Sequence, residues 1–170
     1  MTLRAYELGK IVENSVKEAL INIGCYVDHW SDNHFKYPFK FKSQKGIKKS
    51  WSDFNIHKIP DFKSCDYIIE VKSISESTKN LKQSNKKLIG DIMVEYKQYM
   101  AYFEKATRYR NKETIYYVLV GPCDKDLILE HLSEYRSWYW MKDKFNVVYL
   151  DELIEILRKK IEIYNNLVAA

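Results

Sequence analysis

The chain has 170 residues, of which 46% are hydrophobic and 30% charged, and its formal net charge is +5. This length suits one domain with a sizeable core, so we expect residues 1–170 to form a single domain, and the mild basic excess is compatible with a polyanionic partner. The absence of a membrane-length apolar stretch, of a signal-peptide core and of any Cys-x-x-Cys pair excludes membrane, secreted and zinc-ribbon classes and favours a cytoplasmic protein.

The first elements expected along the chain are a helix, a strand and an insertion. Apolar residues recur at helical spacing over 5–23, and Gly24 is placed to end that helix in a left-handed conformation. The pattern of residues 25–30 predicts a short strand. Residues 33–52 stand out as an insertion in which lysines alternate with aromatic residues.

A hairpin, a loop and a long helix are expected next. Two strands of a hairpin are predicted at 54–63 and 65–73. The polar stretch at 75–87 predicts a loop. Apolar residues at helical spacing over 88–106 then predict a helix.

The last third of the chain alternates strand and helix. The fully apolar stretch at 114–122 predicts an inner strand, residues 124–140 a helix, and residues 145–150 a further strand. A closing helix is expected at 151–166 with Asp151 as its N-cap. The element order predicts an α/β fold with a mixed central sheet flanked by helices.

Three charged residues around the predicted hairpin indicate a site for chemistry. Glu70 and Lys72 lie two positions apart on one strand, so they point to the same face, and Asp61 follows a proline at the end of the preceding apolar run. Two carboxylates supply the hard oxygen ligands that Mg²⁺ prefers, and the ion polarises a scissile phosphate. Lys72 is suited either to orient and deprotonate a water or to stabilise the charge of the transition state.

Each of these residues also has an interpretation without chemistry. Glu70 and Lys72 would also fit a strand that packs one face on the core and exposes its other, charged face to solvent. Asp61 also fits a turn after Pro60, and Asp66 is a competing acidic residue nearer to Glu70.

Pro60-Asp61 followed by Glu70-Val71-Lys72 resembles the signature of the PD-(D/E)XK nuclease superfamily, which includes type II restriction endonucleases, archaeal Holliday junction resolvases and Mrr-like enzymes. The resemblance implies a restriction endonuclease-like core, metal binding by Asp61 and Glu70, and Lys72 as the catalytic lysine. The stretch Gly9 to Glu13 is similar to the Gly-x-x-x-Glu helix of resolvase and Mrr-like members, which implies that Glu13 completes the metal site. Family members also place a polar residue of the next helix near the lysine, for which Gln98 or Lys97 are the candidates.

The function implied is that of a Mg²⁺-dependent endonuclease, with Mn²⁺ as a substitute ion, that cuts double-stranded DNA in the manner of a restriction enzyme. The alternatives are a Holliday junction resolvase and a non-catalytic nucleic-acid-binding module with the same fold. A homodimer is expected, because two DNA strands need two active sites. No glycine-rich nucleotide-binding motif is present, so no nucleotide cofactor is expected.

The insertion at 33–52 predicts a DNA-contacting surface. Lysines displace the counterions of phosphates, and aromatic residues offer stacking platforms for bases. Lysines also guard the exposed edges of sheets, and the two interpretations are compatible. The lysines are Lys36, Lys40, Lys42, Lys45, Lys48 and Lys49.

Overall fold

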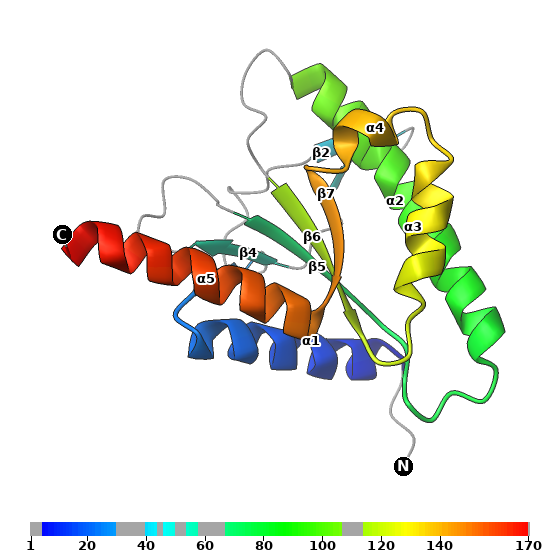
Figure 1. The fold of residues 1–170 in the computed structure, drawn as a ribbon. Coiled ribbons are helices and arrows are strands. Elements are labelled where there is room, and N and C mark those ends of the chain that lie inside the picture. The colour runs from blue at the N-terminus through cyan, green and yellow to red at the C-terminus, as the bar shows by residue number, and fades with distance from the viewer. Residues whose placement is uncertain are drawn as a thin grey trace.

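The structure is a computed structural model that describes residues 5–29, 40–43, 46–49, 54–57, 67–106 and 114–169 (Figure 1). Its elements are α1 (Ala5–Asn22), β1 (Tyr26–His29), β2 (Lys40–Ser43), β3 (Gly46–Lys49), β4 (Phe54–His57), β5 (Tyr67–Ser73), α2 (Leu81–Ala106), β6 (Thr114–Val120), α3 (Lys125–Ser133), α4 (Trp138–Met141), β7 (Phe145–Tyr149) and α5 (Leu150–Ala169).

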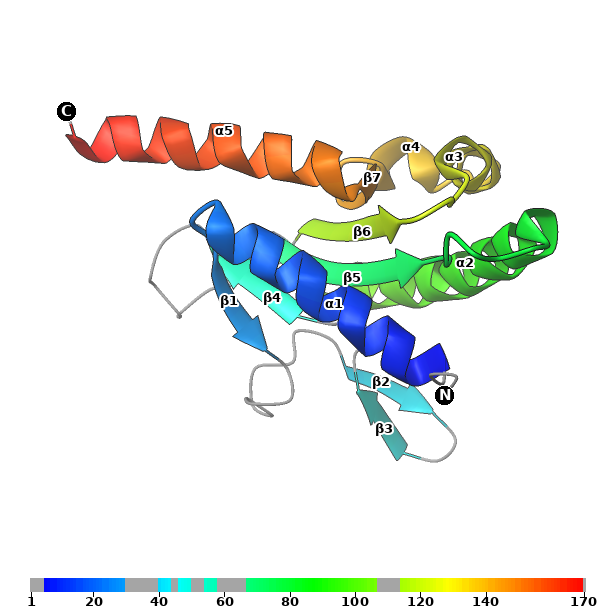
Figure 2. The same ribbon diagram turned by 90° about the horizontal axis from the view of Figure 1, so that it is seen from below.

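The main sheet has five strands in the order β1-β4-β5-β6-β7. The pairs β1–β4 and β4–β5 are antiparallel, and β5–β6 and β6–β7 are parallel. β6 therefore lies inside the sheet, and the predicted hairpin is present as β4 and β5. The expected α/β fold with a mixed sheet between helices is confirmed (Figures 1 and 2).

Each face of the sheet is covered by its own set of helices. One apolar cluster joins side chains of β5, β6 and β7 to those of α2, α3 and α4, and a second joins the opposite face to α1 and α5. Figure 2 shows α1 and α2 on opposite sides of β5. Because helices cover both faces of β5, both the odd-numbered and the even-numbered side chains of this strand face the interior.

The first helix ends as its sequence predicts. Gly24 adopts a φ of 104°, and the amide of Cys25 donates to the carbonyl of Leu20 at 3.0 Å. Only glycine adopts this left-handed conformation readily, so it closes α1 and turns the chain into β1.

The predicted loop at 75–87 is wrong over its second half, because α2 begins at Leu81. The Asn80 side chain accepts a hydrogen bond from the amide of Gln83 at 3.1 Å and donates one to the Gln83 side chain at 3.2 Å. This reciprocal pairing caps the helix and lets it begin within a polar stretch.

Two further expectations at the C-terminal end are corrected. The single helix predicted at 124–140 is two, α3 and α4, and the Asp124 side chain caps α3 by accepting from the amide of Leu127. Asp151 is not an N-cap, since α5 starts one residue earlier. The carboxylate of Glu152 instead accepts the amide of Tyr149 at 2.9 Å.

The turn after β6 passes very close to the end of β5. Gly121 has a φ of 85°, and a Cβ atom there would lie 1.9 Å from the carbonyl oxygen of Ile74. The amide of Ile74 donates to the carbonyl of Val120 at 3.1 Å, which holds the two chain segments together. This position therefore requires glycine for its conformation and for its space.

Candidate nuclease site

The strand that carries the motif presents its charged residues to α2. Ile68, on the same side of β5 as Glu70 and Lys72, belongs to the apolar cluster under α2. The Nζ atom of Lys72 lies 3.4 Å from Oε1 of Glu70, so the two residues share a face as expected. Glu70 is 6% exposed, and the interpretation of this pair as a solvent-facing strand surface is therefore wrong.

A second carboxylate reaches Lys72 from α2. The lysine Nζ donates a 2.8 Å hydrogen bond to Oε1 of Glu95, and the hydroxyl of Tyr117 on β6 donates a 2.7 Å bond to Oε2 of the same carboxylate. Tyr117 is also the register partner of Glu70 across the parallel pair β5–β6. We call these four residues, Glu70, Lys72, Glu95 and Tyr117, the lysine cluster.

The electrostatic surroundings keep the lysine protonated. Burial acts to lower the pKa of Lys72, but the negative charges of Glu70 and Glu95 and their hydrogen bonds outweigh it, so the pKa lies above its ordinary value. In the protein alone, Lys72 is an ammonium group and a hydrogen-bond donor at neutral pH.

The residue of α2 that binds Lys72 is Glu95, whereas the sequence predicted Gln98 or Lys97 near the lysine. Lys97 lies over the ring of Tyr135, 5.7 Å from its centroid, on the side of the helix toward α3. Gln98 is half-buried one turn after Glu95. The sequence did contain a signal for Glu95: Leu88, Ile92, Glu95 and Tyr99 recur at spacings of four, three and four, which places a carboxylate in an otherwise apolar row.

Glu13 is buried on α1. It is 6% exposed and stands in the row with Val16 and Leu20, which pack against the sheet, while Lys10 lies 3.4 Å from its Oε2. Its metal role stays a prediction. A Cβ atom at Gly9 would meet nothing within 4 Å, so no close approach of the helix requires glycine there.

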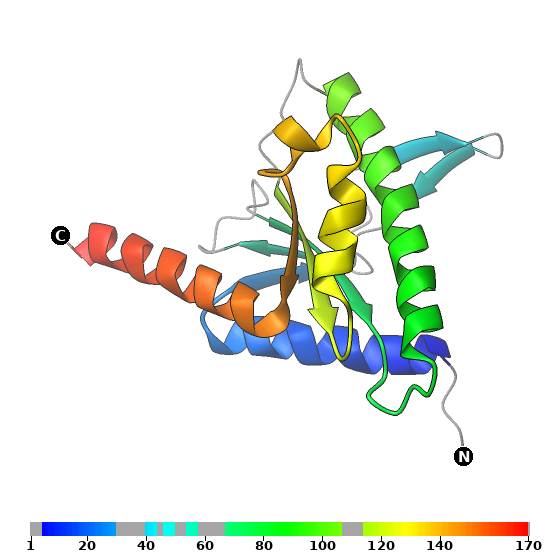
Figure 3. The same ribbon diagram turned by 45° about the vertical axis from the view of Figure 1, so that its right-hand side comes forward.

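Asp61 and its competitor Asp66 lie outside the described residues, as do Lys36 and Lys45. The other four lysines of the insertion lie on β2 and β3, which pair with each other as a separate two-stranded sheet in which Lys40 is opposite Lys49. Figure 3 shows this hairpin apart from the five-stranded sheet. The edge strands of the five-stranded sheet are β1 and β7, so the hairpin guards neither edge by pairing with it.

The described residues supply two of the carboxylates expected to bind Mg²⁺. Glu70 and Glu13 are buried carboxylates, and a buried carboxylate requires a nearby cation or hydrogen-bond donors. Within the described ranges no group of three or more metal-ligating side chains is present. Asp61, which the resemblance pairs with Glu70, belongs to the part of the chain that is not described.

None of the helices in the described ranges combines the length and apolar character needed to cross a membrane. Comparison with protein-family models, with curated proteins and with solved structures finds no match to this chain.

Proposed function

We propose that this protein is a Mg²⁺-dependent endonuclease that hydrolyses phosphodiester bonds in double-stranded DNA. The observation that carries the proposal is the lysine cluster. A buried carboxylate and a partly buried lysine, two residues apart, lie together on a strand of a hairpin, and the lysine is held by a further carboxylate. Keeping such a group beneath a helix costs desolvation energy, and a functional role accounts for that cost.

The order of elements supports a restriction endonuclease-like core of the PD-(D/E)XK type. A helix precedes an antiparallel set of strands that includes the motif strand, and a long helix then crosses to a parallel strand beside it. Pro60 and Asp61 fall in the sequence after β4 and before β5, in the part of the chain that is not described.

In this proposal Glu70 and Asp61 hold the Mg²⁺ ion, with Glu13 as the third carboxylate. When bound, the ion polarises the scissile phosphate and makes the attacking water more acidic. The Lys72 ammonium, fixed by Glu95, donates hydrogen bonds to the phosphate oxygens on which negative charge develops, or orients the water through the same donors.

The experiment that tests the function is cleavage of a DNA panel in the presence of Mg²⁺, Mn²⁺ or a chelator. The panel contains linear duplexes of varied sequence, four-way junctions and single strands. We expect metal-dependent cutting of linear duplex by a homodimer, with both strands cut. Preference for four-way junctions would identify a resolvase, and metal-independent binding without any cleavage would identify a non-catalytic module.

The lysine-rich insertion is expected to add to DNA affinity through phosphate contacts. Replacing several of its lysines by glutamine should weaken binding and reduce the slope of log affinity against log salt by roughly one per lost contact. Fluorescence anisotropy at several salt concentrations measures this slope. The lysines to replace are Lys36, Lys40, Lys42, Lys45, Lys48 and Lys49.

The matched control is Lys159→Gln, which changes an exposed lysine of α5 whose side chain is 70% exposed. It should leave the slope unchanged. An unaltered slope in the insertion variants would mean that these lysines do not contact phosphates.

A further inference from the structure

Glu95, which the motif does not contain, links the candidate lysine to a neighbouring strand. Its Oε1 accepts a 2.8 Å hydrogen bond from Lys72 on β5, and its Oε2 accepts a 2.7 Å bond from the Tyr117 hydroxyl on β6. Two strands thus engage the two oxygens of one carboxylate. A carboxylate bound at both oxygens has a fixed orientation, so it is able to fix its partners in turn.

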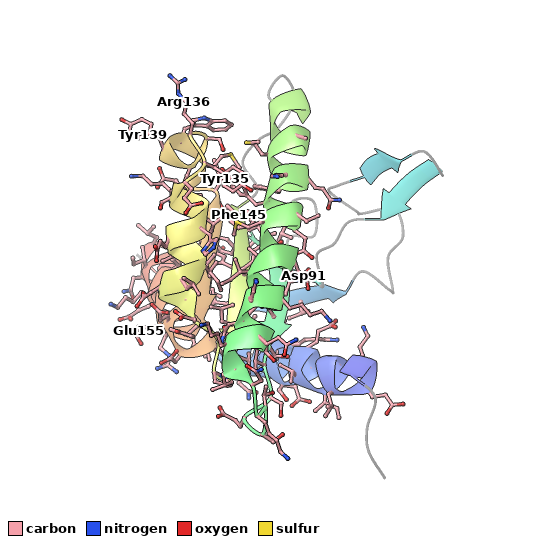
Figure 4. The ribbon with its side chains drawn as sticks, turned by 90° about the vertical axis from the view of Figure 1, so that its right-hand side faces the viewer. Asp91, Tyr135, Arg136, Tyr139, Phe145 and Glu155 are labelled. Carbon is pink, nitrogen blue, oxygen red and sulfur yellow. The ribbon has the colours of Figure 1, made fainter. Side chains whose placement is uncertain are left out.

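The support behind Glu95 is rigid. Tyr117 is fully buried, and its ring packs against Phe145 with the centroids 4.6 Å apart. Phe145 is held in turn by Tyr96, with centroids 5.1 Å apart, and it lies in the layer between α2 and α3 (Figure 4). Because close-packed rings leave little room for movement, the Tyr117 hydroxyl has one position from which to orient Glu95.

The distances around Lys72 show what Glu95 does. The ammonium is nearer to Glu95, at 2.8 Å, than to Glu70, at 3.4 Å. A lysine stem is flexible, so without the negative charge of Glu95 the ammonium would be drawn onto Glu70 alone. It would then compete for the carboxylate oxygens that the proposed metal needs.

We propose that Glu95 is a positioning residue that holds the Lys72 ammonium beside Glu70 without letting it close onto that carboxylate, and that Tyr117 positions Glu95. The inference rests on the proposed function, in which Glu70 binds the metal and Lys72 acts on the scissile phosphate. Glu95 itself touches neither the substrate nor the metal.

The test is Glu95→Gln, which keeps the size of the side chain and removes its charge. The Mg²⁺ concentration for half-maximal cleavage should rise and kcat should fall, each on the order of tenfold to a hundredfold. This is the usual effect of losing a residue that orients the groups around a metal ion. KM for DNA should change little. Without DNA, Mn²⁺ affinity measured by electron paramagnetic resonance should weaken in the same range.

Two companion variants separate positioning from structural damage. Tyr117→Phe keeps the packed ring and removes the hydroxyl, so it should shift the metal dependence in the same direction by a smaller factor, and it carries the test if Glu95→Gln fails to fold. Asp91→Asn removes an exposed carboxylate from the same helix and should leave the cleavage rate and Mn²⁺ affinity unchanged (Figure 4).

The outcomes distinguish this inference from the proposed function. If the wild-type protein cleaves DNA and Glu95→Gln matches it in metal dependence and in Mn²⁺ affinity, the positioning role is wrong and the proposed function stands. Faster cleavage by Glu95→Gln would also overturn positioning, because Glu95 would then restrain the lysine. A wild-type protein that neither cleaves DNA nor binds Mn²⁺ overturns the proposed function and this inference together.

Discussion

Lys72→Ala is expected to lower the Mg²⁺-dependent cleavage rate by about 100- to 1000-fold, which is the usual cost of removing one donor that stabilises developing charge. DNA binding should largely persist, because the six lysines of the insertion, which are proposed to add to DNA affinity, are unchanged in this variant. Single-turnover cleavage and fluorescence anisotropy measure the two quantities on the same preparation. Lys72→Arg keeps the charge but not the shape of the donor, so we expect it to retain only part of the activity.

The same assay decides which aspartate belongs to the site. Asp61→Ala should match Lys72→Ala in its loss of cleavage, whereas Asp66→Ala should cleave at the wild-type rate. Full activity of Asp61→Ala together with inactive Asp66→Ala would transfer the metal-binding role to Asp66. Lys142→Ala, at the exposed position directly after α4, serves as the lysine control and should remain active.

Gly121→Ala is expected to destabilise the fold more than any other single methyl addition among the described glycines. Alanine at a φ of 85° costs about 1–2 kcal/mol, and its methyl group would also lie 1.9 Å from the Ile74 carbonyl oxygen, so the chain must shift. A total loss of about 3–5 kcal/mol corresponds to a fall in melting temperature of roughly 10 °C or more for a chain of this size. Thermal unfolding followed by circular dichroism measures it.

The control for this substitution is Gly90→Ala in α2, where an added Cβ meets nothing within 4 Å. Alanine is the better helix former by about 1 kcal/mol, so this variant should be slightly more stable than the wild type. A Gly121→Ala protein as stable as wild type would mean that the turn after β6 relaxes freely away from β5.

The pattern of apolar residues predicted most of the sheet, because strands that are buried in a core must carry apolar side chains. The alternation and apolar content of 65–73 and 114–122 predicted strands that are present as β5 and β6. The start of α2 was missed because its first turns bury little apolar surface. The cap formed by Asn80 and Gln83 was a sequence signal for it, as a capping residue followed three positions later by glutamine is typical of a helix start.

The candidate site was predictable only where its residues share a strand. Glu70 and Lys72 lie on one face by the geometry of a β-strand, and spacing alone gives this. The contact between Lys72 and Glu95 spans 23 residues and depends on how α2 crosses the sheet, which sequence spacing does not specify. The prediction of Gln98 or Lys97 passed over Glu95: the row that Glu95 shares with Leu88 and Ile92 marks the side of α2 that meets the sheet.

The lysine cluster is carried entirely by β5, α2 and β6, which follow one another along the chain. A strand, a helix and a second strand in succession form one folding unit, whereas α1 reaches β5 across the intervening strands β1 to β4 of the sequence. The edge strand β1 is thus able to open transiently while the cluster stays assembled, whereas β7 carries Phe145, which packs against Tyr117. Amide hydrogen exchange should accordingly be slowest for the protons of β5 and β6, because these strands lie inside the sheet.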